Sequence, residues 1–203
     1  MITKDFQMPD EIVGSKISLS RVEANNKEVV QNICDVLYSG ETLKRIRKTM
    51  NYFSETPDDV PSLISALNST FQKGGFNYFI FKNNEAIGQI FGRPFLGSSG
   101  MITSIWGWIS DNALRQGYMK KAVKMIENEY FTQNLDPLEI YVRTNSVVDS
   151  FAKAVHFQAQ STDAVRSYYR YREDWLAEQQ MKRICSSEKG NITHNINTQG
   201  MSR

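Results

Sequence analysis

Apolar and polar residues alternate along several short segments of the chain, which is the pattern of half-buried β-strands. The first of these segments, KISLSRVE, begins at Lys16, and the others lie in the second two thirds of the chain. The predicted strands are 16–23, 76–82, 86–91, 101–110, 137–144, 158–164 and 167–172. Asn83 and Asn84 separate two of them and predict a hairpin turn.

Apolar residues at intervals of three and four predict helices between these strands. The clearest helix is predicted over 118–131. The other predicted helices are 25–38, 41–53, 57–73, 146–155 and a short one that ends near 184. No internal linker interrupts this order, so we predict one α/β domain over 16–176, after an N-terminal arm at 1–15. Residues 177–203 are predicted to be a C-terminal helix and a disordered polar tail.

The composition indicates a soluble globular domain, because 40% of the residues are hydrophobic and 23% are charged. A formal net charge of +2 argues against a nucleic-acid partner, and the basic stretch Lys44–Lys48 is a solvated helix face or a binding patch. We find no membrane-spanning segment and no apolar core of a signal peptide. We therefore expect a cytoplasmic protein without a membrane partner.

Two cysteines, Cys34 and Cys185, lie far apart, and neither belongs to a Cys-x-x-Cys pair. Together with the two histidines they cannot supply a zinc site of the usual spacing, so we expect no metal. Reduced thiols fit a cytosolic protein, and a disulfide between them is the alternative.

One strand, loop and helix have the pattern of an anion site. The segment SIWGWISDNALRQGYMKKAVKMIENEYF, which begins at Ser104, joins an apolar strand to the helix predicted over 118–131. Gly117 stands before that helix, and no Ser, Thr or Asp immediately precedes it as a cap. The first helical amides are then available to an anion, and glycine lets a phosphate approach the backbone. An ordinary strand–helix turn is the alternative interpretation.

The order of the elements resembles that of the GNAT acetyltransferases, and within them the branch of the ribosomal-protein N-terminal acetyltransferases. KISLSRVE, EAIGQIFG and IWGWISDNALRQGYMKKA resemble the opening strand, the Ile-Gly strand, and the strand with pyrophosphate loop of that branch. Asn145 and Phe157 have the spacing of the family's Asn and Gly-Phe pair, and YYRYREDW resembles the final strand. The resemblance covers about residues 16–175. It implies a GNAT fold, with a mixed, mainly antiparallel sheet of six to seven strands and helices on both faces.

This resemblance implies an N-acetyltransferase that uses acetyl-CoA as co-substrate and acetylates a primary amine. The residues implied to hold the cofactor are Trp108, Ile109, Ser110, Leu114, Arg115, Gln116, Gly117, Tyr118, Met119 and Asn145. Leu114 and Met119 depart from the family's loop pattern, which has Arg or Gln first and Gly or Ala last. A GNAT-derived binding or regulatory module with little catalysis is therefore the alternative function.

The family's acid–base residues are also replaced. Ala152 and Val148 occupy the positions of its Tyr and Ser, and Ser104 occupies that of a strand carboxylate. We predict Ser150 as the catalytic acid and Asp111 as the carboxylate that orients a water, a role that Glu139 in the next strand also fits.

Trp106 and Trp108 lie two residues apart and so share one face of their strand. They pack in the core or form a stacking platform, and a platform would favour an aromatic or planar acceptor. Neither the acceptor nor the oligomeric state has a signature in the sequence.

Overall fold

The structure is a computed structural model, and it describes residues 8–21, 27–37, 41, 42, 44, 75–97, 100–133, 135, 137–143, 147–160 and 165–199. The helix predicted over 57–73 lies outside the described residues, as does most of the helix predicted over 41–53. Asn145 also lies outside them.

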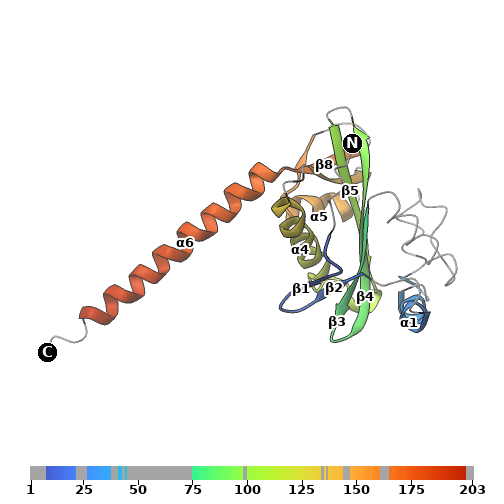
Figure 1. Ribbon diagram of the computed structural model, residues 1–203, viewed down its shortest axis with the longest axis horizontal. Coiled ribbons are helices and arrows are strands. Elements are labelled where there is room, and N and C mark those ends of the chain that lie inside the picture. The colour runs from blue at the N-terminus through green and yellow to red at the C-terminus, as the bar shows by residue number, and fades with distance from the viewer. Residues whose placement is uncertain are drawn as a thin grey trace.

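Eight strands form one sheet in the order β1-β2-β3-β4-β5-β6-β8-β7 (Figure 1). Their bounds are β1 Glu11–Val13, β2 Ser18–Ser20, β3 Phe76–Lys82, β4 Glu85–Gly97, β5 Gly100–Ile109, β6 Leu138–Arg143, β7 Gln158–Ala159 and β8 Val165–Arg170. Every neighbouring pair is antiparallel except β5 and β6, which run parallel. The predicted mixed, mainly antiparallel sheet is confirmed, with eight strands in place of six to seven. One of the additional strands, β1, comes from the predicted N-terminal arm.

Helices cover both faces of this sheet, as predicted: α1 lies on one face, and α4 and α5 lie on the other (Figure 1). The α-helices are α1 Lys27–Leu37, α4 Tyr118–Thr132, α5 Val147–Ala154 and α6 Arg172–Gln199. A short 3-10 helix, η1 Asp111–Ala113, connects β5 to α4.

The core between the sheet and α4 decides which way the residues of β5 point. Ala122, Ile126 and Phe131 of α4 are fully buried, as the helical pattern predicted. Tyr130 of the same helix donates a hydrogen bond to Thr103 Oγ1 of β5 at 2.9 Å. Because side chains alternate along a strand, the odd-numbered residues of β5 face α4 and the even-numbered ones face the α1 side.

The predicted hairpin between β3 and β4 is confirmed. Asn83 and Asn84 have φ values of 51° and 66°, the left-handed pair that a type I′ turn requires. Asparagine tolerates this conformation better than most residues, so Asn-Asn serves in place of Asn-Gly.

Strand β4 continues past Phe91, where the prediction ended it, to Gly97. Pro94 interrupts the sequence pattern because proline cannot donate to a β-ladder. Pairing with β3 ends at Gly92, opposite Phe76. No backbone N–H is therefore needed at Pro94 on the β3 side. Pairing with β5 alone extends β4 to its end.

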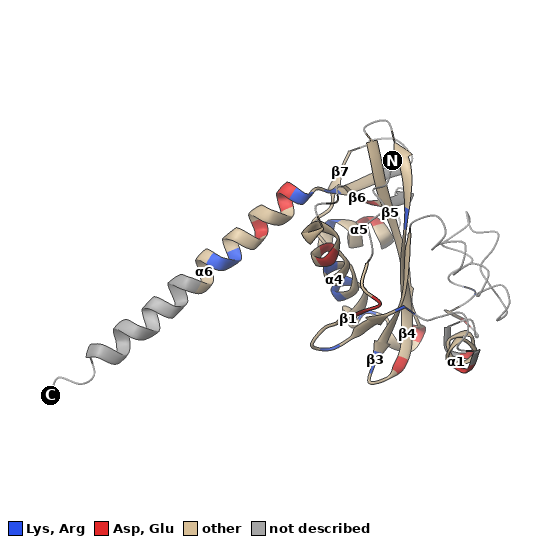
Figure 2. Ribbon diagram, viewed as in Figure 1, with Lys and Arg blue, Asp and Glu red and all other residues tan. Residues whose placement is uncertain are grey.

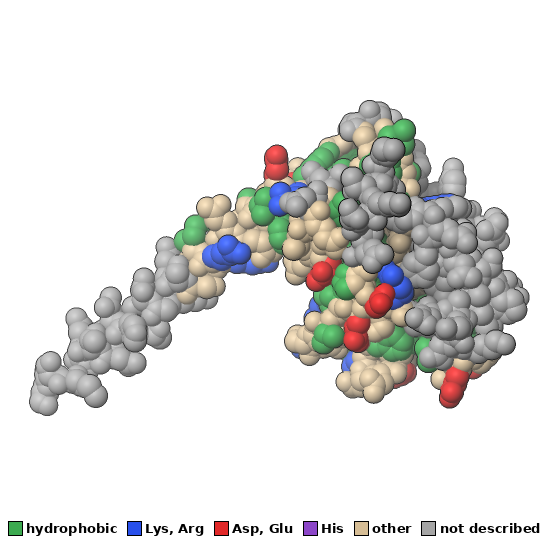
Figure 3. Space-filling view, viewed as in Figure 1, with side chains coloured by type: hydrophobic (Ala, Val, Ile, Leu, Met, Phe, Trp, Pro, Cys, Tyr) green, Lys and Arg blue, Asp and Glu red, His purple; other side chains and the backbone are tan. Residues whose placement is uncertain are grey.

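Helix α6 projects away from the sheet and continues to Gln199, which differs from the predicted helix end near Ile184 and disordered tail (Figure 1). Leu176, Met181 and Ile184 are exposed, and hydrophobic side chains are visible on the half of the helix next to the domain (Figure 3). Apolar periodicity detects helices that bury one face, and these three apolar side chains of the described part of α6 are not buried.

A cluster of ion pairs connects the start of α6 to α4 and β8. Lys124 of α4 bonds to Glu127 at 2.8 Å and to Glu178 of α6 at 3.4 Å. Arg170, at the end of β8, bonds to Glu178 at 2.5 Å and lies 4.0 Å from Glu127. Lys182 adds a bond to Glu178 at 2.8 Å. Charged residues of both signs accordingly meet where α6 leaves the domain (Figure 2).

Candidate active site

The loop between β5 and α4 ends on a glycine with a left-handed backbone. Gly117 is the N-cap of α4, with φ 75° and no side-chain capping bond. Lys121 N–H donates to the Gly117 carbonyl at 3.1 Å, as in the first turn of an α-helix. The amides of Tyr118, Met119 and Lys120 are therefore the unsatisfied first-turn donors that every helix start presents. This confirms the loop, glycine and uncapped helix expected from the sequence.

Two lysines lie beside the ring of Tyr118, the residue that carries the first of these amides. Lys82 Nζ lies 5.2 Å from the ring centroid of Tyr118, and Lys121 Nζ lies 5.4 Å from the same centroid. The helix dipole adds a partial positive charge at this end of α4. Sequence reasoning missed Lys82, because it belongs to β3 and reaches the loop only through the fold.

Strands β5 and β6 pair over a short distance and then part. Their parallel ladder consists of Thr103 opposite Leu138 and Ser104 opposite Glu139. Thr103 N–H donates to the Pro137 carbonyl at 3.2 Å at the start of this ladder. Beyond Ser104, β5 continues for five residues to Ile109 without a β6 partner in the register. The two strands thus form a V, with its apex at Ser104 and Glu139.

The parted section of β5 presents an open edge to this V. Thr103 directs its N–H to the β6 side, whereas Ser110 N–H donates to the Ile87 carbonyl on the β4 side at 2.8 Å. Backbone groups alternate in direction along a strand, so Gly107 directs its N–H and C=O to the β6 side. An extended chain laid along this edge would find a donor and an acceptor at Gly107.

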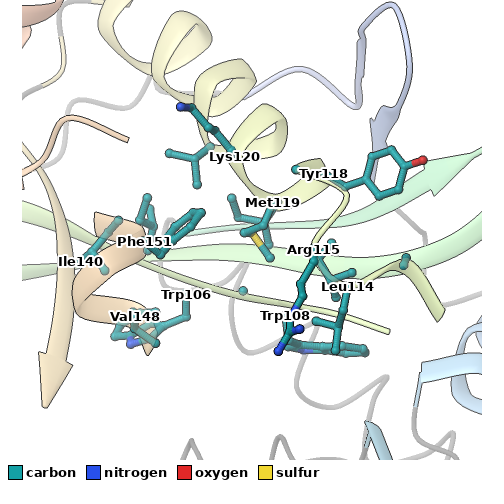
Figure 4. A pocket seen from close by; sticks show the side chains of 17 residues that line it. Trp106, Trp108, Leu114, Arg115, Tyr118, Met119, Lys120, Ile140, Val148 and Phe151 are labelled. Carbon is teal, nitrogen blue, oxygen red and sulfur yellow. The ribbon is translucent and has the colours of Figure 1, made fainter. Parts of the chain in front are cut away.

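An apolar cleft of about 440 Å³ occupies the space between the open edge, the loop and α5. Its floor and walls come from β5, β6 and the starts of α4 and α5 (Figure 4). The side chains labelled in Figure 4 are Trp106, Trp108, Leu114, Arg115, Tyr118, Met119, Lys120, Ile140, Val148 and Phe151. The volume lies within the range of small-molecule sites, roughly 300–1,000 Å³.

Solved structures with this architecture are acetyltransferases. The microcin C7 self-immunity acetyltransferase MccE, solved with acetyl-CoA and AMP, matches with a TM-score of 0.64 at 11% identity over 78% of this chain and 93% of its own. The Salmonella typhimurium acetyltransferase that modifies the N-terminal serine of ribosomal protein L7/L12 matches with a TM-score of 0.63 at 14% identity over 79% and 98%. A probable acetyltransferase of the GNAT family from Chromobacterium violaceum gives a TM-score of 0.65 at 16% identity over 84% and 96%.

The chain has the GNAT fold. This finding confirms the fold on which the sequence interpretation depended, and it rests on structural similarity. No protein-family model and no curated protein sequence matches the chain.

Most residues predicted to hold the cofactor do surround the cleft of the GNAT fold. Those that line it are Trp108, Ile109, Leu114, Arg115, Gly117, Tyr118 and Met119. Ser110 and Gln116 do not line it: the Ser110 amide is bonded to β4, and the Gln116 side chain donates to the Asn112 carbonyl at 3.0 Å. The predicted contact of Asn145 falls outside the described residues.

Met119, which replaces a small residue of the GNAT pattern, lies over a glycine. A Cβ at Gly107 would stand 2.7 Å from Met119 Cε and 3.1 Å from its Sδ. Glycine at 107 therefore makes room for the thioether, so that the bulk of Met119 is accommodated against β5. The amide of Met119 remains in the first turn of α4, where a phosphate would meet it.

Trp106 and Trp108 both line the cleft, and both belong to the even-numbered, α1-side residues of β5. Trp106 also stacks on Phe91 of β4, with ring centroids 5.7 Å apart and planes inclined by 27°. Trp108 is buried. The same two side chains thus pack in the core and form part of the wall of the cleft.

The predicted catalytic residues lie beside the cleft and not in its lining. Ser150 is exposed on α5, where its neighbours Val148 and Phe151 do line the cleft. Asp111 is exposed in η1, and its amide donates to Thr42 Oγ1 at 3.2 Å. The structure does not bring Ser150 and Asp111 together, and their roles stay predictions.

Cys34 is buried, Cys185 is exposed, and neither forms a disulfide. Within the described ranges, no group of three or more His, Cys, Asp and Glu residues could hold a metal ion. None of the helices in the described part of the chain is long and apolar enough to cross a membrane.

Proposed function

We propose that this protein is an N-acetyltransferase that transfers the acetyl group of acetyl-CoA to a primary amine, by direct attack in a ternary complex. The observation that carries the proposal is the open edge of β5 beside the uncapped start of α4. These two features meet in one cleft and match two adjoining parts of a CoA molecule, its pyrophosphate and its amide-bearing arm.

The pyrophosphate belongs at the start of α4. The amides of Tyr118, Met119 and Lys120 supply donors, and the left-handed Gly117 leaves the approach open, since no atom lies within 4 Å of a Cβ built there. Lys82 and Lys121 supply positive charge without occupying the amides.

The pantetheine arm belongs along β5. Its amides would pair with the N–H and C=O of Gly107, as an added strand pairs with a sheet edge. The apolar lining of the cleft suits the methylene groups between those amides. This places the thioester toward the apex of the V, away from the phosphates.

The acceptor is a protein N-terminus or a small-molecule amine. One structural relative supports the first class, since it modifies an N-terminal serine. The competing function is a GNAT-fold module that binds its ligand with little catalysis. Val148, which lines the cleft where the related branch has a serine, favours that alternative.

Isothermal titration with acetyl-CoA and with free CoA tests the proposal. We expect dissociation constants on the order of micromolar. Gly117→Trp should abolish binding, because the indole would fill the space in front of the first-turn amides. Gly100→Trp is the matched control: Gly100 also has a positive φ, 123°, and open space at its Cβ, but it lies at the far end of β5.

Thiol release from acetyl-CoA in the presence of an amine panel separates the two functions. The panel contains a peptide with a free N-terminal serine, tryptamine and spermidine. Binding with amine-dependent thiol release supports the enzyme, and binding without release supports the non-catalytic module. Absence of binding at millimolar cofactor contradicts the enzyme and leaves the non-catalytic alternative.

A further inference from the structure

Three polar residues lie side by side on the α1-side face of the sheet, at the apex of the V. Ser104 of β5 is the register partner of Glu139 of β6, and Glu139 is the register partner of Tyr169 of β8. Neighbouring strands are about 4.8 Å apart, so these side chains are immediate neighbours on one face. Sequence reasoning named Glu139 only as an alternative and did not name Tyr169.

The row is buried and incompletely hydrogen-bonded. Glu139 is 4% exposed and Ser104 is 2% exposed. Tyr169 donates its hydroxyl to Glu139 Oε1 at 3.0 Å. Ser104 Oγ is buried and has no hydrogen-bond partner among the described residues. An unsatisfied buried hydroxyl is costly to a fold, which points to a bound water or substrate group as its partner.

Tyr169 is the hydrogen-bond donor of the row. Burial, followed by the charge of Glu139, raises the pKa of Tyr169 above its ordinary value of 10.0. Tyr169 therefore stays protonated at neutral pH, and its hydroxyl donates to Glu139. At the ends of the same row, Arg93 of β4 and Gln158 of β7 are exposed, and Gln158 donates to Asp174 at 3.1 Å.

The position of the row fits the reacting end of the cofactor. Phosphates at the start of α4 occupy the wide end of the V, next to Ile109. The arm that follows β5 from there toward Ser104 runs about 17 Å, at ~3.3 Å per residue. Helices α4 and α5 cover one face of the sheet, and α1 lies on the other (Figure 1). We place the amine on the α1 side, which is the face of Glu139.

We propose that Glu139 is the general base of the acetyl transfer, held in place by Tyr169 and connected to the amine through the Ser104 hydroxyl. This inference rests on the proposed acetyltransferase function. None of Asp111, Ser150 and Glu139 lines the cleft. Asp111 and Ser150 are exposed, whereas Glu139 is a buried side chain at the apex of the V.

In this step the acceptor ammonium gives one proton to Glu139, through Ser104. The freed nitrogen lone pair attacks the thioester carbonyl carbon and forms the C–N bond. The C–S bond then breaks, and its electron pair leaves on the CoA sulfur. The second proton lost from nitrogen goes to the thiolate, and Glu139 returns its proton to solvent as the products leave.

Kinetics of Glu139→Gln test the assignment, with the amine panel named above and with water as the acceptor that is always present. Glutamine keeps the size and still accepts from Tyr169, but it cannot take a proton. We expect kcat for acetyl transfer to fall by roughly 10²- to 10⁴-fold, the range of general base catalysis. Acetyl-CoA affinity by titration should stay within about twofold.

The pH dependence of kcat separates a catalytic role of Glu139 from a structural one, because a purely structural residue would not change it. With water as the acceptor, no amine titrates, so the rise of wild-type kcat with pH reports the base. That rise should disappear in Glu139→Gln and shift in Tyr169→Phe. Glu85→Gln, on the exposed hairpin, is the matched control and should behave as wild type.

Each outcome of these experiments supports or contradicts the assignment of Glu139 as the base. Loss of turnover and of the pH dependence in Glu139→Gln, with intact cofactor binding, supports the base. Wild-type turnover and pH profile in Glu139→Gln overturn this inference and leave the proposed acetyltransferase standing. A wild-type protein that binds acetyl-CoA but transfers to neither amine nor water overturns both the inference and the catalytic function.

Discussion

The contact between Gly107 and Met119 makes the substitution Gly107→Ala a sharp test of the cleft geometry. A methyl group at 107 would lie 2.7 Å from Met119 Cε, about 0.8 Å short of the ~3.5 Å separation of nonbonded carbon atoms. It would also lie 2.8 Å from the Gln89 carbonyl oxygen. The thioether can move aside, but the carbonyl belongs to the β4–β5 ladder and can move only with the strand.

Overpacking of this kind costs about 1–3 kcal/mol, and alanine recovers up to ~1 kcal/mol of the entropy that glycine loses in a strand. We therefore expect a net loss of about 1–2 kcal/mol in the free energy of unfolding. For a chain of this size, that corresponds to a fall in Tm of about 2–8 °C. The cofactor should also bind more weakly, because the displaced thioether has to enter the cleft.

A double-mutant cycle by thermal denaturation measures the contact itself. In a Met119→Ala background the methyl group meets only the Gln89 carbonyl, so the cost of Gly107→Ala should fall by about 0.5–1.5 kcal/mol. An equal cost in both backgrounds, or a change in Tm below about 1 °C in the single variant, would refute the placement of Met119 over β5.

Two further predictions concern helix α6. Burial opposes ionisation of Glu178, but the hydrogen bond from Lys182 and the charges of Lys124 and Arg170 prevail and lower its pKa from 4.5 to about 2. The ionised form is thus favoured by folding, so the Tm advantage of wild type over Glu178→Gln should be full above pH 4.5 and shrink as the pH falls toward 2; a constant difference contradicts this. Removal of residues 187–203 should leave the Tm unchanged within about 1 °C, whereas truncation after Ala177 should lower it, because Glu178 bonds to α4 and β8.

Local patterns were sufficient to predict the elements that build the candidate site. The bounds of β3 are those predicted, and α4 ends one residue later than expected. Alternation and helical periodicity reflect which side of a segment is buried, and turn residues such as Gly117 report backbone conformation directly. The resemblance to the GNAT acetyltransferases then implied a mixed, mainly antiparallel sheet, which the structure confirms.

Contacts between distant segments could not be obtained in this way. Lys82 reaches Tyr118 only because β3 and α4 meet in space. The catalytic residues were predicted from positions close to the loop and in the helix after β6, and both of them, Asp111 and Ser150, are exposed. The sequence contains nothing that distinguishes Glu139 from other strand carboxylates.

The sequence by itself determined most helices and strands and the uncapped helix start, because these depend on neighbours within a few positions. Its resemblance to the GNAT acetyltransferases implied the fold class and seven of the residues that line the cleft. Tertiary structure decided where β5 and β6 part, that Gly107 faces the open edge, and that Ser104, Glu139 and Tyr169 lie in one row. Strand register sets all three, and a shift of one residue would turn Glu139 to the other face. Register results from the packing of the whole sheet against its helices, so it emerges only when the chain is folded.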